Sequence, residues 1–213
     1  MKTKPTHTAG SPIRASFFWM RMSAWYALLT IALLSAPLIA RATEVQGGSA
    51  TAPDYLPDAA LVDQAGHPVS FAALKGKPVL VGFIHASCQG VCQLLTAKMK
   101  SVSKELDPSF NTKVTMVSVT TDPKEDGPAQ LTAYAKAQGA VGPGWVFLTG
   151  QREQVARILK RYGVPEGDPG DELTHVDQLY LIGADGHELH HYGGTEVAAA
   201  TVAADIRSAL TRR

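Results

Sequence analysis

Apolar residues beyond position 56 occur either in continuous runs or at helical spacing. Residues 77–84 (KPVLVGFI) and 113–119 (KVTMVSV) are continuous runs rich in β-branched side chains, which is typical of strands buried on both faces. Between them, apolar side chains in residues 91–106 recur every three or four positions, which indicates a helix. The pattern therefore predicts a buried strand, a helix and a second buried strand in succession.

Turn and capping residues mark the other elements. Hairpins are predicted where short apolar runs flank a glycine-containing turn, at 59–71 and at 177–194 with its Ala-Asp-Gly turn. Pro128 at a first helical position and Gly139 after a last one are typical helix boundaries. The remaining predicted elements are a helix at 128–138, a strand at 144–150, a helix at 151–164 closed by Gly163, and a helix at about 196–210.

Strands that alternate with helices predict an α/β fold with a central mixed sheet flanked by helices. The order is that of a thioredoxin-like fold: a strand that leads to a cysteine pair at a helix start, a further strand and helix, and then a β-hairpin and a closing helix. The extra N-terminal β-hairpin is typical of the peroxiredoxin-like variant of this fold.

A further apolar segment, residues 22–40, carries no charge and follows a basic N-terminus. Its length suits a membrane-spanning helix, which needs about 20 apolar residues. It is followed by Arg41 and Ala42, and the resulting Ala-Arg-Ala is a pattern that a signal peptidase can cut. The basic flank stays in the cytoplasm in either case, so we expect the rest of the chain to be exported.

This segment divides the chain into three predicted parts. Residues 1–42 are a signal-anchor or signal peptide, residues 43–55 are a flexible linker rich in small residues, and residues 56–213 are a thioredoxin-like domain. We favour an uncleaved anchor, because the apolar run exceeds the 7–15 residues typical of a signal peptide. The predicted location is a periplasmic or otherwise extracytoplasmic domain tethered to the membrane. A soluble periplasmic protein, cut near Ala42, is the alternative.

The charge and cysteine content of the chain exclude some classes of partner and some roles for the cysteines. The formal net charge is +1 and the chain has no long basic run, which argues against binding to nucleic acid. Its two cysteines, Cys88 and Cys92, are too close together to make an effective structural staple, because closing so short a loop removes little entropy from the unfolded chain.

Cys88 and Cys92 lie four residues apart at a predicted helix start, so their side chains share one face. Two sulfur atoms there can form a redox-active disulfide or bind one metal ion. The helix N-terminus is expected to favour the thiolate, which is both the nucleophile of disulfide exchange and a ligand for Cu(I). The spacing alone leaves both functions open.

Three motifs, in order between about residue 56 and the C-terminus, resemble those of the Sco/SenC family of copper-delivery proteins. The first is VLVGFIHASCQGVCQLL, around the cysteines; the second is VTTDPKEDGPAQLTAYAKAQG, a loop that leads into a helix; the third is THVDQLYLIGADG, which begins at Thr174 and His175. The N-terminal anchor and spacer also fit this family.

The resemblance implies a copper site formed by Cys88, Cys92 and His175. Two thiolates suit Cu(I), and an added imidazole lets the same site hold Cu(II). It also implies a metallochaperone, which needs no catalytic turnover and delivers copper to the dinuclear copper centre of a haem–copper oxidase. The expected partners are an oxidase subunit and a thioredoxin-like reductant. A thiol–disulfide oxidoreductase that keeps client cysteines reduced, and a copper or redox sensor, are the alternatives.

The chain departs from the family pattern near each ligand. Gln93 replaces a proline after the second cysteine, Thr174 replaces an aspartate before the histidine, and His85 stands where an aromatic residue is usual. A carboxylate commonly orients a liganding imidazole. The residues that could supply one here are Asp171, Glu172 and Asp177.

Other polar clusters are predicted to have no metal or catalytic role. His187, His190 and His191 lie on one predicted strand, where alternation places His190 on the face opposite the other two. Asp122 and Asp126 stand beside prolines and are predicted to shape a turn next to the site.

Overall fold

The continuous apolar run near residue 80 forms the central strand β3 (Val79–Ile84) in a computed structural model of the chain. All six of its residues are buried, as the absence of polar alternation predicts. Every described residue lies in the unit Thr51–Arg213. The structure describes residues 53–106, 112–166 and 176–211.

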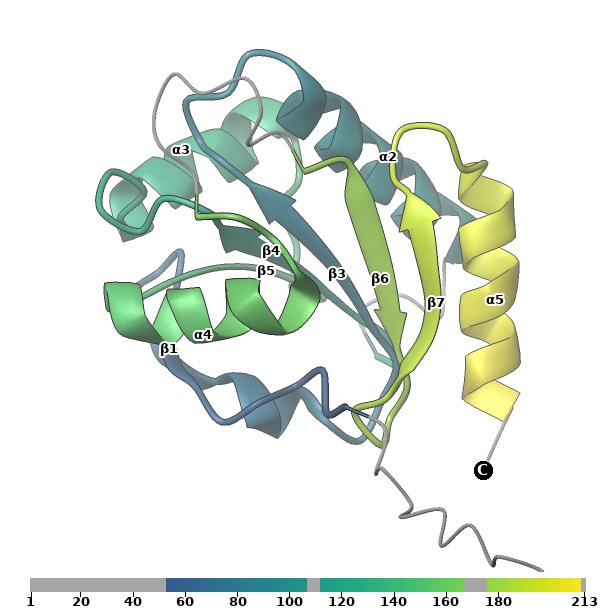
Figure 1. Ribbon diagram of the computed structural model, residues 1–213. Coiled ribbons are helices and arrows are strands. Elements are labelled where there is room, and N and C mark those ends of the chain that lie inside the picture. The colour runs from purple at the N-terminus through teal and green to yellow at the C-terminus, as the bar shows by residue number, and fades with distance from the viewer. Residues whose placement is uncertain (1–52, 107–111, 167–175, 212–213) are drawn as a thin grey trace, which may run out of the picture. The chain divides into compact units, whose positions relative to one another are not determined.

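The described elements follow the predicted order (Figure 1). Before β3 come a short hairpin and a single 3-10 turn; after it, helices and strands alternate until a second hairpin and a final helix. The other elements are β1 (Ala60–Asp63), β2 (Pro68–Ser70), η1 (Phe71–Leu74), α2 (Val91–Leu106), β4 (Thr115–Thr120), α3 (Pro128–Gln138), β5 (Trp145–Thr149), α4 (Arg152–Tyr162), β6 (Gln178–Ile182), β7 (Glu188–Gly193) and α5 (Ala199–Thr211).

The described strands form one mixed sheet in the order β2-β1-β5-β4-β3-β6-β7. β3 runs parallel to β4 on one side and antiparallel to β6 on the other, and β5 runs parallel to β4. The carboxyl ends of β3, β4 and β5 therefore meet at one edge of the sheet. The N-terminal hairpin extends the sheet by pairing β1 with β5.

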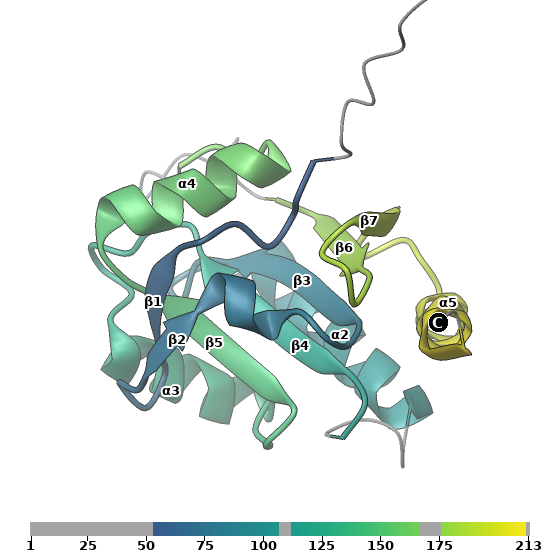
Figure 2. The same cartoon turned by 90° about the horizontal axis from the view of Figure 1, so that it is seen from below.

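Helices cover both faces of the sheet, as Figures 1 and 2 show. One hydrophobic cluster packs α2, α3 and α5 against residues such as Leu80 and Ile84. A second cluster packs α4 and η1 against the opposite face, with Phe83 and Val81. Alternate residues of β3 thus serve both cores. The predicted thioredoxin-like arrangement, with a central mixed sheet between helices, is confirmed.

Local signals set most helix boundaries. α3 has Pro128 at its first position, and Gly139 ends it in the left-handed conformation with φ of 60°. Gly163 ends α4 in the same way. The start of α5 at Ala199 is later than the predicted position near Glu196, because the preceding residues form a turn in which Gly194 donates its N–H to the Asp177 carbonyl.

The predicted N-terminal apolar segment, residues 22–40, lies outside the described residues, as do the proposed cleavage position and most of the linker. Within 53–106, 112–166 and 176–211, no helix has the length and apolar character needed to cross a membrane.

Candidate metal centre

Cys88 and Cys92 lie where β3 gives way to α2. Cys88 lies between the two elements, three residues before α2 begins at Val91. Its N–H donates to the His85 carbonyl over 3.0 Å, and this bond closes a turn after the strand. Cys92 is the second residue of the helix. Both side chains are buried, with exposed fractions of only 6% and 3%, and both belong to the core cluster with Leu95 and Met99. The two thiols are thus almost fully buried, just beyond the carboxyl end of the central strand β3.

The two thiols contact each other through a side-chain hydrogen bond. Burial, with this contact next in importance, raises the pKa of Cys92 to about 12. For Cys92, removal from water therefore outweighs the preference for the thiolate that was expected from the helix N-terminus. A metal or an oxidant that reacts with Cys92 must displace a firmly held proton.

Tyr134 on α3 supports the first turn of α2. Its hydroxyl donates to the Cys92 carbonyl over 2.9 Å and lies 2.8 Å from the Thr96 hydroxyl, which itself bonds that carbonyl over 2.8 Å. Burial, followed by the nearby thiols, raises the pKa of Tyr134. The sequence did not predict this role, since the helical position of Tyr134 beside Ala135 indicates only a core residue.

Asp126 ties the loop after β4 to the loop that carries Cys88. Its Oδ2 accepts the Thr120 hydroxyl at 2.6 Å and the Ala86 N–H at 2.9 Å. The residue is buried, and burial raises the pKa of its carboxyl. This connection across two loops goes beyond the predicted turn role, and no local signal in the sequence points to it.

Asp122 shapes the turn as predicted, because its Oδ1 accepts the backbone N–H groups of Lys124 and Glu125. Its other oxygen, Oδ2, is buried without a hydrogen bond and lies 3.5 Å from His85 Nε2, within ion-pair range of a protonated imidazole. His85 Nδ1 lies 3.2 Å from the Ser87 hydroxyl. The ring that replaces the usual aromatic residue thus bridges the acidic loop and the cysteine loop.

The predicted third ligand, His175, lies outside the described residues, together with Asp171, Glu172 and Thr174. Within the described part of the chain, no group of three or more His, Cys, Asp or Glu side chains could hold a metal ion. The structure therefore brings together two of the three predicted ligands and leaves the role of His175 a prediction.

Asp177, one of the carboxylates proposed to orient His175, has described partners of its own. Its Oδ1 accepts the Thr195 N–H over 2.7 Å, and its Oδ2 bonds the Thr195 hydroxyl. The carboxylate thereby joins the start of β6 to the turn before α5.

The histidines of the second hairpin do not converge. His191 stacks on Tyr180 with ring centroids 4.3 Å apart, whereas His190 stacks with Tyr192 at 5.8 Å. Neighbouring residues of β7 point to opposite faces, as predicted for this pair. His187 precedes the strand, and its N–H caps the turn by donating to a carboxylate oxygen.

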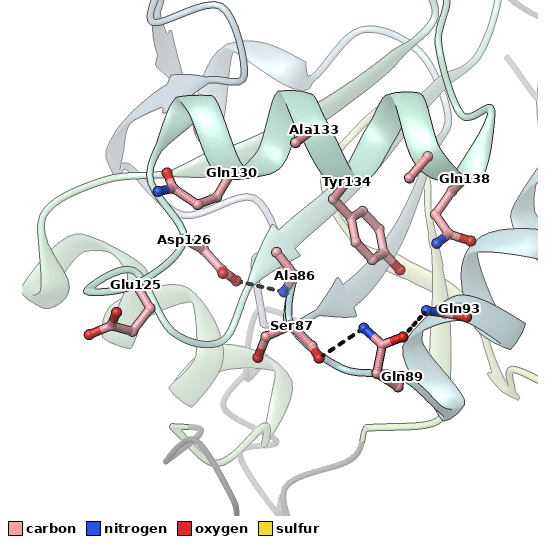
Figure 3. Close-up of a pocket in the computed structure, with 11 residues that line it drawn as sticks. Ala86, Ser87, Gln89, Gln93, Glu125, Asp126, Gln130, Ala133, Tyr134 and Gln138 are labelled. Atoms are coloured by element: carbon pink, nitrogen blue, oxygen red, sulfur yellow. Dashed lines mark hydrogen bonds between the residues drawn. The ribbon is translucent and has the colours of Figure 1, made fainter.

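A groove of about 590 Å³ lies between the cysteine loop and α3 (Figure 3). Ala86, Ser87, Gln89 and Gln93 line one wall, and Tyr134 with neighbouring α3 residues lines the other. Ala86 and Ser87 directly precede Cys88 in the sequence, but neither cysteine is among the described residues that line the groove. Its other lining residues are Glu125, Asp126, Gln130, Ala133, Ala137 and Gln138.

Comparison with known proteins places this arrangement in a family. The family model described as SCO1/SenC matches residues 48–211. The chain belongs to the SCO1/SenC family. The resemblance seen in the three sequence motifs is thereby confirmed.

Relatives of this SCO1/SenC chain match more than two thirds of its length. It is 35% identical over 156 residues to the SCO1 protein homolog of Bacillus subtilis (strain 168), covering 70% of this chain and 79% of that protein. The solved structure of BsSco, a member of the Sco family of cytochrome c oxidase assembly proteins with an identified disulfide switch, superposes with a TM-score of 0.65. It is 29% identical, covering 74% of this chain and 94% of that one.

Another similar structure is that of Bradyrhizobium japonicum ScoI with copper bound. The TM-score is 0.60 at 26% identity, and the match covers 71% of this chain and 97% of ScoI. The family therefore includes members that have been solved with copper bound and members with a disulfide switch.

Proposed function

We propose that this protein binds copper through Cys88, Cys92 and His175 and delivers it to the dinuclear copper centre of a haem–copper oxidase during assembly. The observation that carries the proposal is the pair of contacting, buried thiols at the end of β3. Its support is membership of a family with a copper-bound relative, ScoI, and a relative described as a cytochrome c oxidase assembly protein. Copper is cargo here, so no catalytic turnover is required.

The chemistry of the pair suits this cargo. Thiolates are soft ligands that select Cu(I), and a site enclosed by apolar side chains shields the metal from water. Cu(II) prefers nitrogen ligands, and with two thiolates alone it would tend to oxidise them. An imidazole from His175 is what allows one site to hold both oxidation states.

The proposed location follows from the N-terminus. Residues 1–42 export the chain and either anchor it or are removed near Ala42, residues 43–55 act as a spacer, and residues 56–213 work outside the cytoplasm. Alkaline phosphatase fused after Pro57 should be active in bacteria, because this enzyme needs export to fold. An inactive fusion would place the domain in the cytoplasm and contradict the proposal.

A second function is favoured by the same thiols. The side chains of Cys88 and Cys92 are in contact, and their four-residue separation permits a reversible disulfide; BsSco has a disulfide switch. The protein would then act as a thiol–disulfide oxidoreductase toward client cysteines, with a thioredoxin-like partner as its reductant. In an oxidising compartment that reductant is also needed for copper binding.

A copper titration of the reduced full-length chain distinguishes the two functions. The wild type should bind one copper per chain and show an intense thiolate-to-Cu(II) charge-transfer band. His175→Ala should lose this band, weaken Cu(I) binding modestly and keep its rate of disulfide exchange. His187→Ala, a histidine in a turn of the second hairpin, is the matched control and should behave as the wild type.

If the wild type shows no Cu(II)–thiolate species, or His175→Ala keeps it unchanged, the proposed copper site is wrong and the oxidoreductase is the better assignment. Copper uptake by the disulfide form, measured by mass spectrometry, would contradict the role of the thiolates as principal ligands.

A further inference from the structure

The loop after β4 holds a carboxylate oxygen whose capacity for hydrogen bonds is unused. Asp122 Oδ2 is buried and accepts no hydrogen bond from any described residue, and its side chain is only 7% exposed. Asp122 Oδ1, by contrast, accepts the N–H groups of Lys124 and Glu125. A buried carboxylate oxygen in this state costs free energy unless a donor or a cation reaches it. The unused oxygen therefore points to a ligand that carries positive charge.

The imidazole of His85 faces this oxygen. His85 Nε2 lies 3.5 Å from Asp122 Oδ2. That separation is long for a hydrogen bond, in which a nitrogen and an oxygen are usually about 2.7–3.2 Å apart. Two ligands of one tetrahedral Zn(II) ion lie about 3.4 Å apart, because each bond to the metal is about 2.1 Å long. The spacing of the two atoms is therefore closer to that of metal ligands than to that of a hydrogen-bonded pair.

The other polar atoms of both side chains are held in the way that metal ligands require. His85 Nδ1 lies 3.2 Å from the Ser87 hydroxyl, so a proton on Nδ1 can be donated to Ser87 and leave a lone pair on Nε2. The two N–H bonds to Asp122 Oδ1 orient the carboxylate. Metal-binding histidines and carboxylates in proteins are usually fixed by such outer contacts. Both candidate ligands are thus oriented before an ion arrives.

The charges around the pair favour a cation. Asp126 is a second buried carboxyl group, close enough for the charges of His85 and Asp122 to act on it. Lys124, the basic residue of the same loop, lies 3.4 Å from Glu125, and both of these side chains are exposed. The side chain of His85 is 18% exposed, which gives an ion and its water molecules a path to the site.

The donor atoms and their spacing favour Zn(II) over copper. Imidazole nitrogen and carboxylate oxygen are common ligands of Zn(II), whereas Cu(I) selects sulfur. Cu(II) prefers a tetragonal arrangement, in which neighbouring ligands lie only about 2.9 Å apart. Among the described residues, no group of three or more His, Cys, Asp or Glu side chains could hold a metal ion, so water must complete the coordination. Binding should therefore be weaker than at a structural zinc site, which has four protein ligands.

We propose that His85 Nε2 and Asp122 Oδ2 bind a Zn(II) ion, with water at its remaining positions. The ion joins the segment that precedes Cys88 to the loop after β4. The site uses neither thiol, so it goes beyond the copper function proposed above and does not depend on it. Because His85 stands where the family usually has an aromatic residue, the site is expected in this chain and not in the family as a whole.

The test is a calorimetric titration of the full-length chain with Zn(II). The disulfide form is used, because its sulfur atoms no longer compete as thiolates. The wild type should bind Zn(II) at a site that two variants lose. His85→Phe and Asp122→Asn each remove one of two protein ligands, so each should weaken binding by more than the roughly 10–100-fold that loss of an outer partner costs. Ser87→Ala removes such an outer partner and should weaken binding about tenfold.

His67 and Asp63 form the matched control pair. His67 Nδ1 and Asp63 Oδ2 lie 3.2 Å apart, within hydrogen-bonding distance, and the histidine side chain is 76% exposed. His67→Phe should bind Zn(II) as the wild type does. Co(II) in place of Zn(II) gives a second readout, because tetrahedral Co(II) has intense visible absorption bands. These bands should appear with the wild type and be absent with His85→Phe.

A wild type that binds no Zn(II), or a His85→Phe variant that binds it as tightly as the wild type, would overturn the proposal. An equally large loss in His67→Phe would also overturn it, because binding would then depend on exposed histidines in general. If the disulfide form cannot be isolated, the double variant Cys88→Ser/Cys92→Ser removes the thiolates in the same way. The copper titration of the reduced wild type is a separate measurement, and its failure would count against the thiol site alone.

Discussion

The two faces of the sheet use buried polar groups in different ways. On the α4 face, aromatic rings pack edge to face, with Phe83 and Tyr162 centroids 5.1 Å apart, and the Tyr162 and Tyr180 hydroxyls donate to backbone carbonyls. On the α2 face, the Tyr134 hydroxyl also donates to a carbonyl, but that carbonyl belongs to Cys92. The α4 face uses hydrogen bonds to close a core. The other face uses them to hold the segment that carries Cys88 and Cys92.

The largest difference between the faces should appear when a thiol is removed. Cys92→Ser should lower Cu(I) affinity by more than the roughly 10–100-fold that loss of an outer-shell partner costs, because a hydroxyl is a poor ligand for a soft ion. Tyr162→Phe on the α4 face should leave the affinity unchanged. Competition with a Cu(I) chelator measures both. A Cu(I) affinity of Cys92→Ser close to that of the wild type would show that Cys92 is not a copper ligand.

Truncating a core side chain should lower the stability of the protein by a similar amount on either face of the sheet. Only a truncation on the α2 face should also change the reactivity of the thiols. Leu95→Ala and Ile158→Ala each remove a fully buried aliphatic side chain, so each should lower the free energy of unfolding by about 2–5 kcal/mol. Leu95 packs in the cluster that contains both cysteines, so its truncation should also change the rate of thiol alkylation in the native state. Denaturant unfolding and alkylation kinetics test this. If the alkylation rate changed in Ile158→Ala but not in Leu95→Ala, the expected link between the α2 face and thiol reactivity would be wrong.

Burial of the Cys92 thiol on the α2 face also predicts that copper binding depends on pH. In the proposed site copper binds the Cys92 thiolate. Burial raises the pKa of Cys92 to about 12, so copper must displace a proton at every pH below that value. Cu(I) affinity should therefore rise about tenfold per pH unit from this group alone and continue to rise above pH ~9, where an ordinary thiol would level off. Chelator competition at several pH values provides the measurement, and a plateau near pH ~9 would contradict it.

The smallest expected effect compares two tyrosine hydroxyls. Tyr134→Phe and Tyr162→Phe each remove one hydrogen bond to a carbonyl, and each should cost about 0.5–1.5 kcal/mol of stability. In Tyr134→Phe, Thr96 still bonds the Cys92 carbonyl. We nevertheless expect a measurable shift in the dithiol–disulfide equilibrium with glutathione for Tyr134→Phe and none for Tyr162→Phe. Equal equilibria in the two variants would indicate that Tyr134 is only a core residue.

The elements that the sequence predicted correctly are those with local causes. Unbroken apolar character identified β3, while Pro128 and Gly139 marked both ends of α3 because the first lacks an N–H and the second adopts a left-handed conformation. The cysteine pair was also local, since both residues lie at one strand-to-helix junction. For this reason its position beside the sheet could be predicted from the order of the elements.

What the sequence could not show depends on partners far along the chain. The bond from Asp126 to the Ala86 N–H joins loops that follow two different strands, and Thr195 delays the start of α5 by bonding Asp177. The raised pKa of Cys92 could not be predicted for the same reason: it comes from burial in a core cluster that includes side chains of α3 and the sheet. These features depend on packing between residues that are far apart in the sequence, so a local sequence pattern cannot predict them.

The order of the strands has a consequence for how the chain is made. Val79 at the start of β3 pairs with Ile182, and Val62 in the first hairpin pairs with Thr149, so both pairings wait for late parts of the chain. Non-local pairings of this kind slow folding, and stopped-flow refolding can time them. Until β6 emerges from the ribosome, the central strand lacks one neighbour and the thiol pair lacks part of its apolar surroundings. For the proposed export of the chain this delay is favourable, because the core cannot close until β6 has been made.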